Sequence, residues 1–408
     1  MQSLKTVPVS PTDGSVFRLA IVHLVCPEYK VPMFQAIARL SRVQLRLFLG
    51  DKPPNSQPSG MAWVPVEHVK LHNRIIRLFG LEVVWQPLGH TLKPKDYDLV
   101  LLPDGLLYLA NYLIMFKCWW QKVAVGFYTH GYNHQRKGSR LSAILERLRG
   151  VIHRHSDVLV VYAPDGAQHL LEVNRVPPER VFIARNTLDV ERIQSVARGV
   201  TERDIESLRE HLGVLSQDVL VVYPGRLVPI KNPEWVIETV ASLRRDGIPV
   251  RAVFVGDGES LPQLHRRVDE LPQGTRDAIR FAGHVSVDEV SRYLLAGDIT
   301  VMPGMTGLAV VHSFALGKPY VTVAGAAHSP EICYVKHGVN GLIAPETPEG
   351  FAEAVRYLVV HPDVRRAMGE AALSFASTEL TLGHQLRGFE QAIAFVRSRS
   401  ALRSSAVG

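Results

Sequence analysis

The sequence is poor in cysteine and has neither a long apolar run nor a collagen-like repeat. Its three cysteines, Cys26, Cys118 and Cys333, lie far apart in the 408 residues and never in a CxxC spacing. Such sparse cysteines argue against a disulfide framework or a structural zinc site, and they indicate a reducing compartment. With 46% hydrophobic and 21% charged residues, the composition is that of a folded globular protein rather than a disordered chain.

The sequence also offers little that would carry it to or across a membrane. Residues 1–17 are polar and have no apolar signal-peptide core. The most apolar segment, Leu106–Trp120, contains Lys117 and is shorter than the roughly 20 residues that span a bilayer. We therefore expect a cytoplasmic protein.

A surplus of basic residues narrows the classes of partner. The 46 Lys and Arg exceed the 39 Asp and Glu, which gives a formal net charge of +7. A basic chain favours anionic partners such as nucleic acid, anionic lipid or phosphorylated small molecules. No helix-turn-helix, RRM, KH or zinc-finger pattern occurs, and the cations are scattered over both halves, so nucleic acid is the least favoured of these partners.

Short apolar runs that alternate with helical segments predict an α/β fold. Strands of a parallel sheet that is covered on both faces are apolar along their whole length. In the first half, the expected strands are Phe17–Val25, Val43–Leu49, Tyr97–Leu102, Val123–Tyr128, Val158–Tyr162 and Val181–Ala184. A polar and charged stretch at 190–204 is typical of a linker.

A second series of strands and helices follows this stretch. Its expected strands are Val219–Tyr223, Val250–Val255, Ile279–Phe281, Ile299–Met302, Pro319–Val323 and Gly341–Ala344. We therefore predict two Rossmann-like lobes that face a cleft: an N-terminal lobe at 1–195, a C-terminal lobe at 196–375, and a helical tail at 376–408 that packs back towards the N-terminal lobe. In such sheets, ligands bind beyond the carboxyl ends of the strands.

One strand end of the second lobe carries two cations that suit an anion. Gly225 follows strand Val219–Tyr223 and precedes Arg226 and Lys231. An arginine can bind a phosphate through two hydrogen bonds, and a lysine supplies a compact positive charge. The alternative interpretation is a solvated loop with two surface cations.

Two further strand ends of this lobe carry glycines. Gly256 and Gly258 follow strand Val250–Val255 and permit a ligand to approach the backbone closely, although a tight strand-to-helix turn would also explain them. The turn Met302–Leu308 opens the expected helix Leu308–Leu316. The backbone N–H groups that we expect to be free there, and to bind an anion with the helix dipole, are those of Met305, Thr306, Gly307 and Leu308. Three such sites in one lobe suggest a diphosphate ligand.

In this order, the motifs resemble those of the group 1 glycosyl transferases, which are the retaining, nucleotide-sugar-dependent glycosyltransferases of family 4 with the GT-B fold. The resemblance extends from about Leu19 to Ala344 and is strongest from Val219 onward. It rests on the order GRL-xxx-KN, VGDGE, FAGHV, GKP and HGVNG. Each motif alone is weak, but their joint order and spacing are specific.

The resemblance implies a role for each matching residue. Arg226 and Lys231 match the pair that neutralises the donor diphosphate. His130, in the first lobe, matches a histidine that approaches the transferred sugar. The other donor-binding positions that the resemblance implies are Gly225, Gly256, Gly258, Val285, Gly304, Thr306, Gly307, Leu308 and His312.

The chain departs from this family at one motif. Family members usually carry two glutamates with seven residues between them, and the matching positions here are Gly304 and His312. The second glutamate normally holds the donor ribose, and His312 could still make such a bond. Gly304 has no side chain to contact the sugar. Either donor recognition has changed or activity has been lost, and the intact Arg226 and Lys231 favour activity.

The resemblance therefore implies transfer of a sugar, with retention, from a UDP- or GDP-sugar to a hydroxyl of a glycan or lipid-linked acceptor in cell-surface polysaccharide biosynthesis. It implies no cofactor and no metal. One alternative is a non-catalytic nucleotide-sugar-binding subunit. Another is a GT-B nucleotide-sugar 2-epimerase, which needs acidic residues that we cannot place. The DxD pattern at 96–98 precedes a strand, so we interpret it as a strand-start cap.

Two features of the first lobe suit a membrane surface. Leu106–Trp120 ends in two tryptophans, and a basic aromatic-flanked helix can lie in an anionic interface. The cations near this segment are Lys122, Arg136, Lys137, Arg140, Arg147, Arg149 and Arg154. The alternative is a buried core helix beside a solvated charged helix. We expect a peripheral contact with the anionic inner face of the cytoplasmic membrane.

Overall fold

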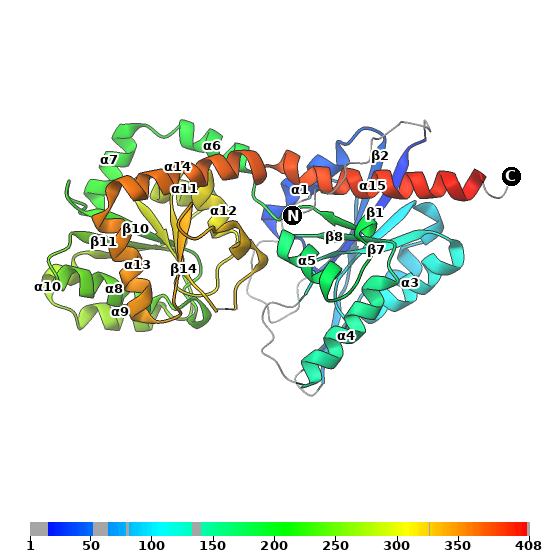
Figure 1. Cartoon of the computed structure of the whole chain (residues 1–408), viewed down its shortest axis with the longest axis horizontal. Coiled ribbons are helices and arrows are strands. Elements are labelled where there is room, and N and C mark those ends of the chain that lie inside the picture. The colour runs from blue at the N-terminus through cyan, green and yellow to red at the C-terminus, as the bar shows by residue number, and fades with distance from the viewer. Residues whose placement is uncertain (1–14, 52–63, 79–80, 133–139, 326, 406–408) are drawn as a thin grey trace. The chain divides into compact units, whose positions relative to one another are not determined.

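The computed structural model describes residues 15–51, 64–78, 81–132, 140–325 and 327–405, which form two units (Figure 1). The first unit contains the described residues up to Arg185 and those from Gly383 onward, and the second runs from Asn186 to Leu382. The boundaries expected from the sequence, 195 and 375, fall inside helices α6 (Val190–Arg198) and α14 (Pro362–Glu379), which belong to the second unit.

The first unit is built on a parallel sheet with the strand order β3-β2-β1-β6-β7-β8-β9. The strands are β1 (Phe17–His23), β2 (Val43–Gly50), β3 (His68–Leu71), β6 (Leu99–Pro103), β7 (Ala124–Thr129), β8 (Val158–Val161) and β9 (Val181–Ile183). Strands β6 and β8, which both have a neighbour on each side, are buried along their whole length, as apolar strands between two helical layers should be. Three strands were not expected from the sequence: β3 and the antiparallel pair β4 (Arg74–Leu78) and β5 (Leu81–Trp85).

Helices cover this sheet and connect its strands. They are η1 (Glu28–Lys30), α1 (Val31–Ala38), α2 (Leu88–Thr91), η2 (Pro94–Asp96), α3 (Leu109–Gln121), α4 (Arg140–Arg154), α5 (Pro164–Glu172), η3 (Pro178–Arg180) and α15 (Leu382–Ser405). The long helix α15 packs on this unit, because Gly388 lies against the backbone of Ile183 and Arg399 pairs with Asp157 at 3.1 Å.

The second unit has a six-stranded parallel sheet with the order β12-β11-β10-β13-β14-β15. The strands are β10 (Val219–Pro224), β11 (Val250–Val255), β12 (Ile279–Gly283), β13 (Ile299–Val301), β14 (Tyr320–Val323) and β15 (Gly341–Ala344). The chain reverses its direction of travel across the sheet between β10 and β13, and ligands of such sheets bind at the carboxyl ends of the strands at this point. The expected strands of this lobe are thereby confirmed.

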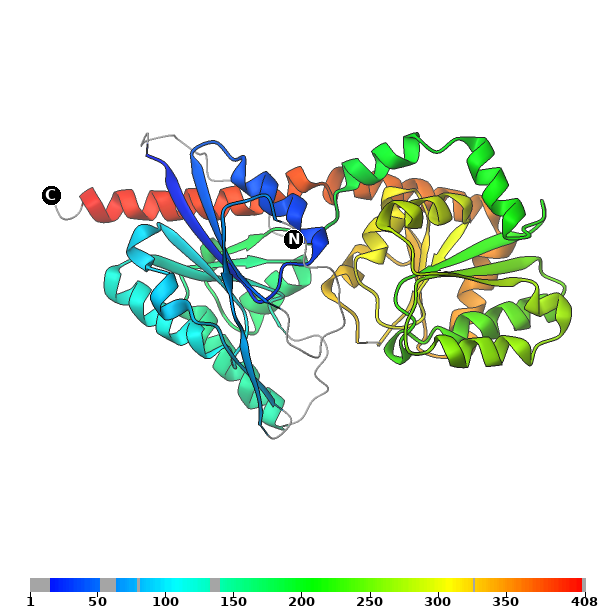
Figure 2. The same ribbon diagram turned by 180° about the vertical axis from the view of Figure 1, so that it is seen from behind.

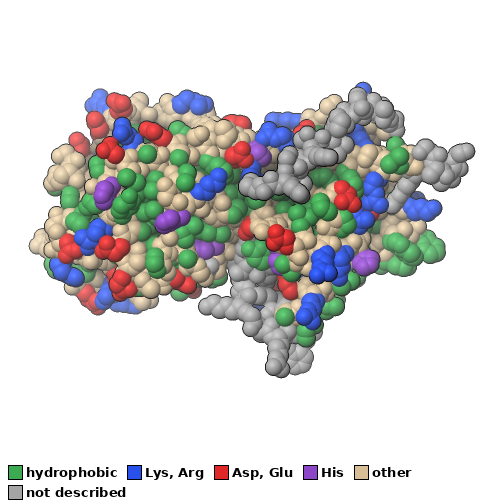
Figure 3. Space-filling model, viewed as in Figure 1, with side chains coloured by type: hydrophobic (Ala, Val, Ile, Leu, Met, Phe, Trp, Pro, Cys, Tyr) green, Lys and Arg blue, Asp and Glu red, His purple; other side chains and the backbone are tan. Residues whose placement is uncertain are grey.

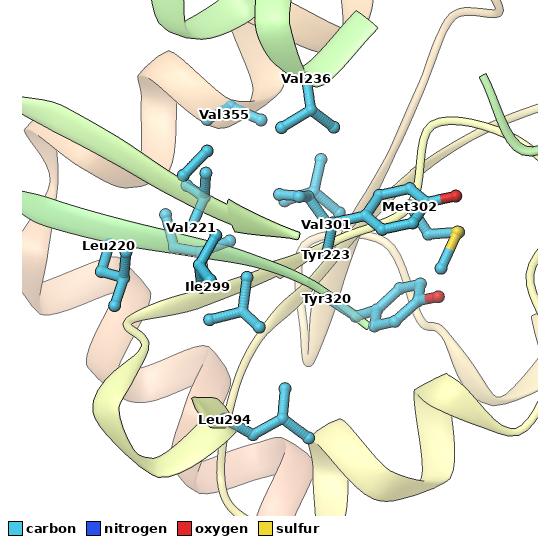
Figure 4. Packing of buried hydrophobic residues seen from close by; sticks show 14 of the residues in the cluster. Leu220, Val221, Tyr223, Val236, Leu294, Ile299, Val301, Met302, Tyr320 and Val355 are labelled. Atoms are coloured by element: carbon cyan, nitrogen blue, oxygen red, sulfur yellow. The ribbon is translucent and has the colours of Figure 1, made fainter. Parts of the chain in front are cut away.

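Helices lie on both faces of this second sheet. Helices α8 (Glu234–Arg245) and α13 (Pro348–Val360) pack on one face, and α11 (Val287–Ala296) and α12 (Ala309–Ala315) lie on the other (Figures 1 and 2). The remaining helices are α7 (Glu202–His211), η4 (Pro229–Lys231), α9 (Leu261–Asp269), α10 (Gln273–Arg276) and η5 (Pro330–Tyr334). Figure 4 shows the side chains of β10, β13 and β14 meeting in the core, with Tyr223 and Met302 near the carboxyl ends of their strands.

The stretch 190–204, expected to be a linker, is helical instead. Helix α6 is capped by the side chain of Asp189, and α7 begins with a capping box in which Thr201 and Asp204 satisfy each other's backbone N–H groups. Val190 and Ile193 of α6 are buried against the core of the second unit. No helix within the described residues is long and apolar enough to cross a membrane.

Candidate functional site: the loops at the carboxyl ends of β10, β11 and β13

The loop after β10 presents two cations close to each other. Arg226 is exposed, and Lys231 is the last residue of η4 and is partly buried. The Lys231 Nζ lies 3.9 Å from the Met302 Sδ, and neither cation has a carboxylate partner among the residues that the structure describes. An unpaired and partly buried ammonium is unfavourable by itself, so it favours an anionic ligand.

Electrostatics strengthen this conclusion. Burial, and after it the positive charge of Arg226, lowers the pKa of Lys231 to about 8. In the free protein, Lys231 therefore begins to lose its proton at a mildly alkaline pH. A polyanion placed between the two cations would restore the charged form.

The glycines of the neighbouring loop hold the Arg226 loop in place. A Cβ on Gly256 would lie 2.1 Å from the Gly225 carbonyl oxygen, and one on Gly258 would lie 2.3 Å from the Leu227 carbonyl oxygen. The Gly225 N–H donates to the Val255 carbonyl at 2.9 Å. Both glycines are therefore required for backbone-to-backbone packing. The glycines therefore form the tight strand-to-helix turn that was the alternative interpretation of the sequence, and their packing fixes the position of Arg226 at the strand end.

The turn after β13 packs against η4. A Cβ on Gly304 would lie 2.5 Å from the Ile230 carbonyl oxygen and from the Lys231 backbone. The Met305 N–H donates to the Ile230 carbonyl at 2.9 Å. The backbone of the cationic loop thus occupies the space in which a side chain at position 304 would begin.

Two of the four amides expected to be free in this turn are engaged, so that expectation is wrong for Met305 and Thr306. The Thr306 N–H donates to Nδ1 of His328 at 3.2 Å. The N–H groups of Gly307 and Leu308 have no acceptor within the described residues. Because α12 spans seven residues, these two N–H groups, rather than a long helix dipole, are what the turn offers to a ligand.

His328 was not identified from the sequence. Its Nδ1 accepts the Thr306 N–H, and its Nε2 therefore carries the proton and donates to the Val323 carbonyl at 2.7 Å. Burial lowers the pKa of His328, which favours this neutral form. Thr306 also bonds through its hydroxyl to the Tyr320 hydroxyl. The sequence offered one signal for it, since His328 stands shortly after β14, the strand that follows this turn.

The two residues expected near the nucleoside lie in different surroundings. His312 is buried, its Nε2 lies 2.8 Å from the Ser291 Oγ on α11, and burial lowers its pKa to about 4. Its imidazole is therefore neutral and faces α11. Val285 is partly buried against the core, two residues after Gly283, whose φ of +72° favours glycine.

The first unit places His130 directly after β7, at the carboxyl end of its sheet. The His130 ring lies on the Tyr162 ring with centroids 4.3 Å apart. The Tyr162 hydroxyl accepts a hydrogen bond from the buried Lys30 Nζ at 2.9 Å, and this ammonium also lies 2.8 Å from the His23 Nε2. Burial, followed by the charge of Lys30, lowers the pKa of His23 well below its usual value, so His23 accepts from Lys30.

A buried hydrogen-bond chain supports the backbone beside His130. The Gly131 N–H donates to the Thr129 hydroxyl at 2.9 Å, and this hydroxyl donates to Asp104. Asp104 also lies 3.3 Å from the His153 Nε2 and pairs with the Arg149 Nε at 3.6 Å. Burial opposes ionisation of Asp104, but the bond to His153 and the charges of His153 and Arg149, together with the Thr129 bond, outweigh it and lower the pKa of the carboxyl to about 2.

Asp98 of the DxD pattern has a structural role. Its carboxylate accepts the backbone N–H of Arg18 at 2.7 Å and pairs with the Arg18 guanidinium at 3.4 Å. The strand-start interpretation is therefore confirmed. Among the described residues, no group of three or more His, Cys, Asp or Glu side chains is arranged to hold a metal ion.

Residues 218–361 match the family described as "Glycosyl transferases group 1", which supports the family suggested by the motifs. Solved structures of glycosyltransferases align with nearly the whole chain, and they confirm the predicted α/β fold with two Rossmann-like units of the GT-B type.

The curated proteins that the chain resembles in sequence are glycosyltransferases. The chain is 29% identical to the alpha-D-kanosaminyltransferase of Streptomyces kanamyceticus over 203 residues, which cover 47% of this chain and 50% of that protein. It is 29% identical to the D-inositol 3-phosphate glycosyltransferase of Corynebacterium glutamicum over 233 residues, or 55% and 54% of the two chains. The alignments thus span about half the length of these curated relatives.

Among solved structures, HepE (Alr3699) of Anabaena in complex with UDP superposes with a TM-score of 0.66 and 17% identity, covering 95% of this chain and 100% of that chain. A glycosyltransferase of Rickettsia africae superposes with a TM-score of 0.68 and 14% identity, covering 93% and 98%. At these identities the likeness establishes the fold alone.

Proposed function

We propose that this protein is a retaining glycosyltransferase of family 4 type that transfers a sugar from a nucleotide diphosphate sugar to a hydroxyl. The observation that carries the proposal is the pair Arg226 and Lys231, two neighbouring cations at the strand ends where a Rossmann-like sheet binds ligands. Neither has a carboxylate partner in the part of the chain that the structure describes. The match of residues 218–361 to group 1 glycosyl transferases, and solved relatives in complex with UDP or UDP-glucose, support a UDP- or GDP-sugar as the donor.

Each group then has a role in the reaction. Negative charge develops on the diphosphate as its bond to the sugar breaks, and Arg226 and Lys231 stabilise this charge. The N–H groups of Gly307 and Leu308 are available to the same oxygens. The leaving phosphate accepts the proton of the acceptor hydroxyl, and His130 approaches the transferred sugar. The cations take the part that a metal ion plays in other transferases, so we propose metal-independent transfer.

A second candidate function rests on the missing carboxylates. Position 304 has no side chain, and His312 faces Ser291, so the chain could bind a nucleotide sugar without transferring it. This non-catalytic subunit would bind the donor but release no nucleotide. Under the favoured proposal, the acceptor is a glycan or lipid-linked precursor of a cell-surface polysaccharide.

Calorimetry with UDP, GDP and their glucose conjugates tests the donor site. We expect Lys231→Met, which keeps length but removes charge, to weaken binding by about 2–3 kcal/mol, or roughly 30- to 150-fold, as loss of a hydrogen bond to a charged group does. Arg226→Ala should act similarly. Arg203→Ala removes one exposed cation from α7 of the same unit and is the control.

Two results would contradict the proposal. Affinity that is unchanged in Lys231→Met and Arg226→Ala would show that the diphosphate binds elsewhere. Donor binding without nucleotide release, when pooled glycan and lipid-linked acceptors are supplied, would favour the non-catalytic subunit.

A further inference from the structure

Helix α3 turns an unusual apolar stripe outward. Its inner side, with Ala110, Ile114 and Cys118, is buried in the core of the first unit. Six further large apolar residues, spaced as one helical face, are exposed to solvent by 37% to 73%: Leu109, Tyr112, Leu113, Phe116, Trp119 and Trp120. The helix is therefore apolar on both sides, and its outer side is covered by described residues only in part, where Leu113 lies beside Gly89 of α2.

The two tryptophans are the most exposed part of the stripe. Trp119 is 71% exposed and Trp120 is 73% exposed, and their rings lie 6.5 Å apart. Phe116 stacks beside Trp119 with ring centroids 6.0 Å apart. An indole has an apolar body and a polar N–H, so it is stabilised where hydrocarbon meets water.

The neighbouring helix extends the apolar face. Helix α4 lies beside α3 (Figures 1 and 2), and its residues Ile144, Leu148 and Val151 are 42% to 55% exposed. The exposed Arg147 and Arg154 lie on the same helix. Arg136 and Lys137, which the sequence analysis counted in this basic neighbourhood, lie outside the described residues.

Cations border the tryptophan end of the stripe. Lys122 follows α3, and Lys95 is held close to it because its backbone N–H donates to the Gln121 side chain at 2.9 Å. Both lysines line a cavity of about 240 Å³, in which Arg18 and Arg399 are paired with Asp98 and Asp157. The lysine side chains themselves have no partner within the described residues. Figure 3 shows hydrophobic side chains with Lys and Arg side chains beside them over this part of the first unit.

We propose that this α3–α4 surface docks the protein on an anionic lipid bilayer. The aromatic stripe would enter the interfacial layer, while Lys95 and Lys122 would contact lipid phosphates. Unpaired lysines favour a lipid surface over a protein partner, because protein–protein interfaces are depleted in lysine whereas anionic leaflets attract it. The surface lies in the first unit, so the proposal rests on the proposed function only in supplying a lipid-linked acceptor to it.

Vesicle flotation of the purified full-length protein tests this docking. We expect binding to vesicles of phosphatidylcholine with 30% phosphatidylglycerol and at least tenfold weaker binding to phosphatidylcholine alone. Trp119→Ser/Trp120→Ser should weaken binding to the anionic vesicles at least tenfold, and Lys95→Glu/Lys122→Glu should weaken it by a similar factor. The control Leu215→Ser/Val339→Ser removes two exposed apolar side chains from the second unit and should bind like the wild type.

Three results would overturn the docking proposal. The first is equal vesicle binding by wild type and tryptophan variant. The second is equal binding to neutral and anionic vesicles. The third is a wild type that does not bind vesicles and is dimeric by light scattering, while the tryptophan variant is monomeric. In that case a second copy of the chain would cover the stripe. The tryptophan variant should bind UDP with the affinity of the wild type. If the wild type itself does not bind UDP, the proposed function is rejected, while the vesicle results alone still decide the docking proposal.

Discussion

Gly304 offers a sharp test of the candidate site, because the substitution that restores a family feature should do harm. A Cβ at this position would lie 2.5 Å from the Ile230 carbonyl oxygen and from the Lys231 backbone. An ordinary contact is at least 3.4 Å, so the loop must move by about 1 Å. The atoms in the way are backbone atoms that cannot rotate aside.

We expect Gly304→Ala to destabilise the second unit by about 1–3 kcal/mol, the usual cost of overpacking. For a unit of about 200 residues, this corresponds to a Tm lower by roughly 2–12 °C. Gly304→Glu, which supplies the carboxylate of the family motif, should be at least as unstable. Because Lys231 lies on the displaced loop, both variants should also bind UDP more weakly.

Thermal unfolding with and without UDP measures both effects. The matched control is Gly274→Ala in α10, where an added Cβ has no atom within 4 Å and where alanine should be neutral or stabilising by up to about 1 kcal/mol. The reasoning fails if Gly304→Ala melts within about 1 °C of the wild type and binds UDP equally well. It also fails if Gly304→Glu gains transfer activity without loss of stability.

Two further predictions follow from the ionisable groups. The pKa of Lys231 is about 8 in the free protein, and a bound diphosphate favours the charged form. UDP affinity should therefore fall as pH rises above 8, by up to about tenfold per pH unit. Calorimetry between pH 7 and 9.5 measures this fall; Lys231→Met should give a flat profile, and a flat profile in the wild type would refute the prediction. The pKa of Asp104 is lowered to about 2 in the folded protein, so its contribution of about 2 kcal/mol is present above pH 4 and is lost as pH falls through 2. Asp104→Asn should lower the urea midpoint at pH 7, and by a smaller amount at pH 2.5, where about a third of the contribution remains. An equal loss at both pH values would show that the charge is not responsible.

Local pattern predicted much of the second unit correctly. The bounds of β11 and β15 are those expected from the sequence, because a buried strand is defined by apolar residues that are adjacent in the sequence. The stretch 190–204 was mistaken for a linker. Its few apolar residues, such as Val190 and Ile193, reveal their burial only once α6 lies on the core.

For the candidate site, the sequence indicated the position of two cations but not the hydrogen bonds around them. Arg226 and Lys231 were found because cations next to a strand end are visible in the sequence. The engagement of the Met305 and Thr306 amides was not, since their acceptors, the Ile230 carbonyl and the His328 ring, come from other loops. Likewise Glu331, buried on η5 and bonded to the Asn186 side chain, has no local signal.

The sequence by itself determined the α/β architecture, its strand ends and the cations that follow β10, because these depend on spacing along the chain. Only the tertiary structure decided that Gly256, Gly258 and Gly304 seat the cationic loop, since a missing Cβ has meaning only against the backbone that faces it. The same holds for α3. The sequence alone does not distinguish a buried apolar residue from an exposed one, and only the packing shows which side of the helix remains in solvent.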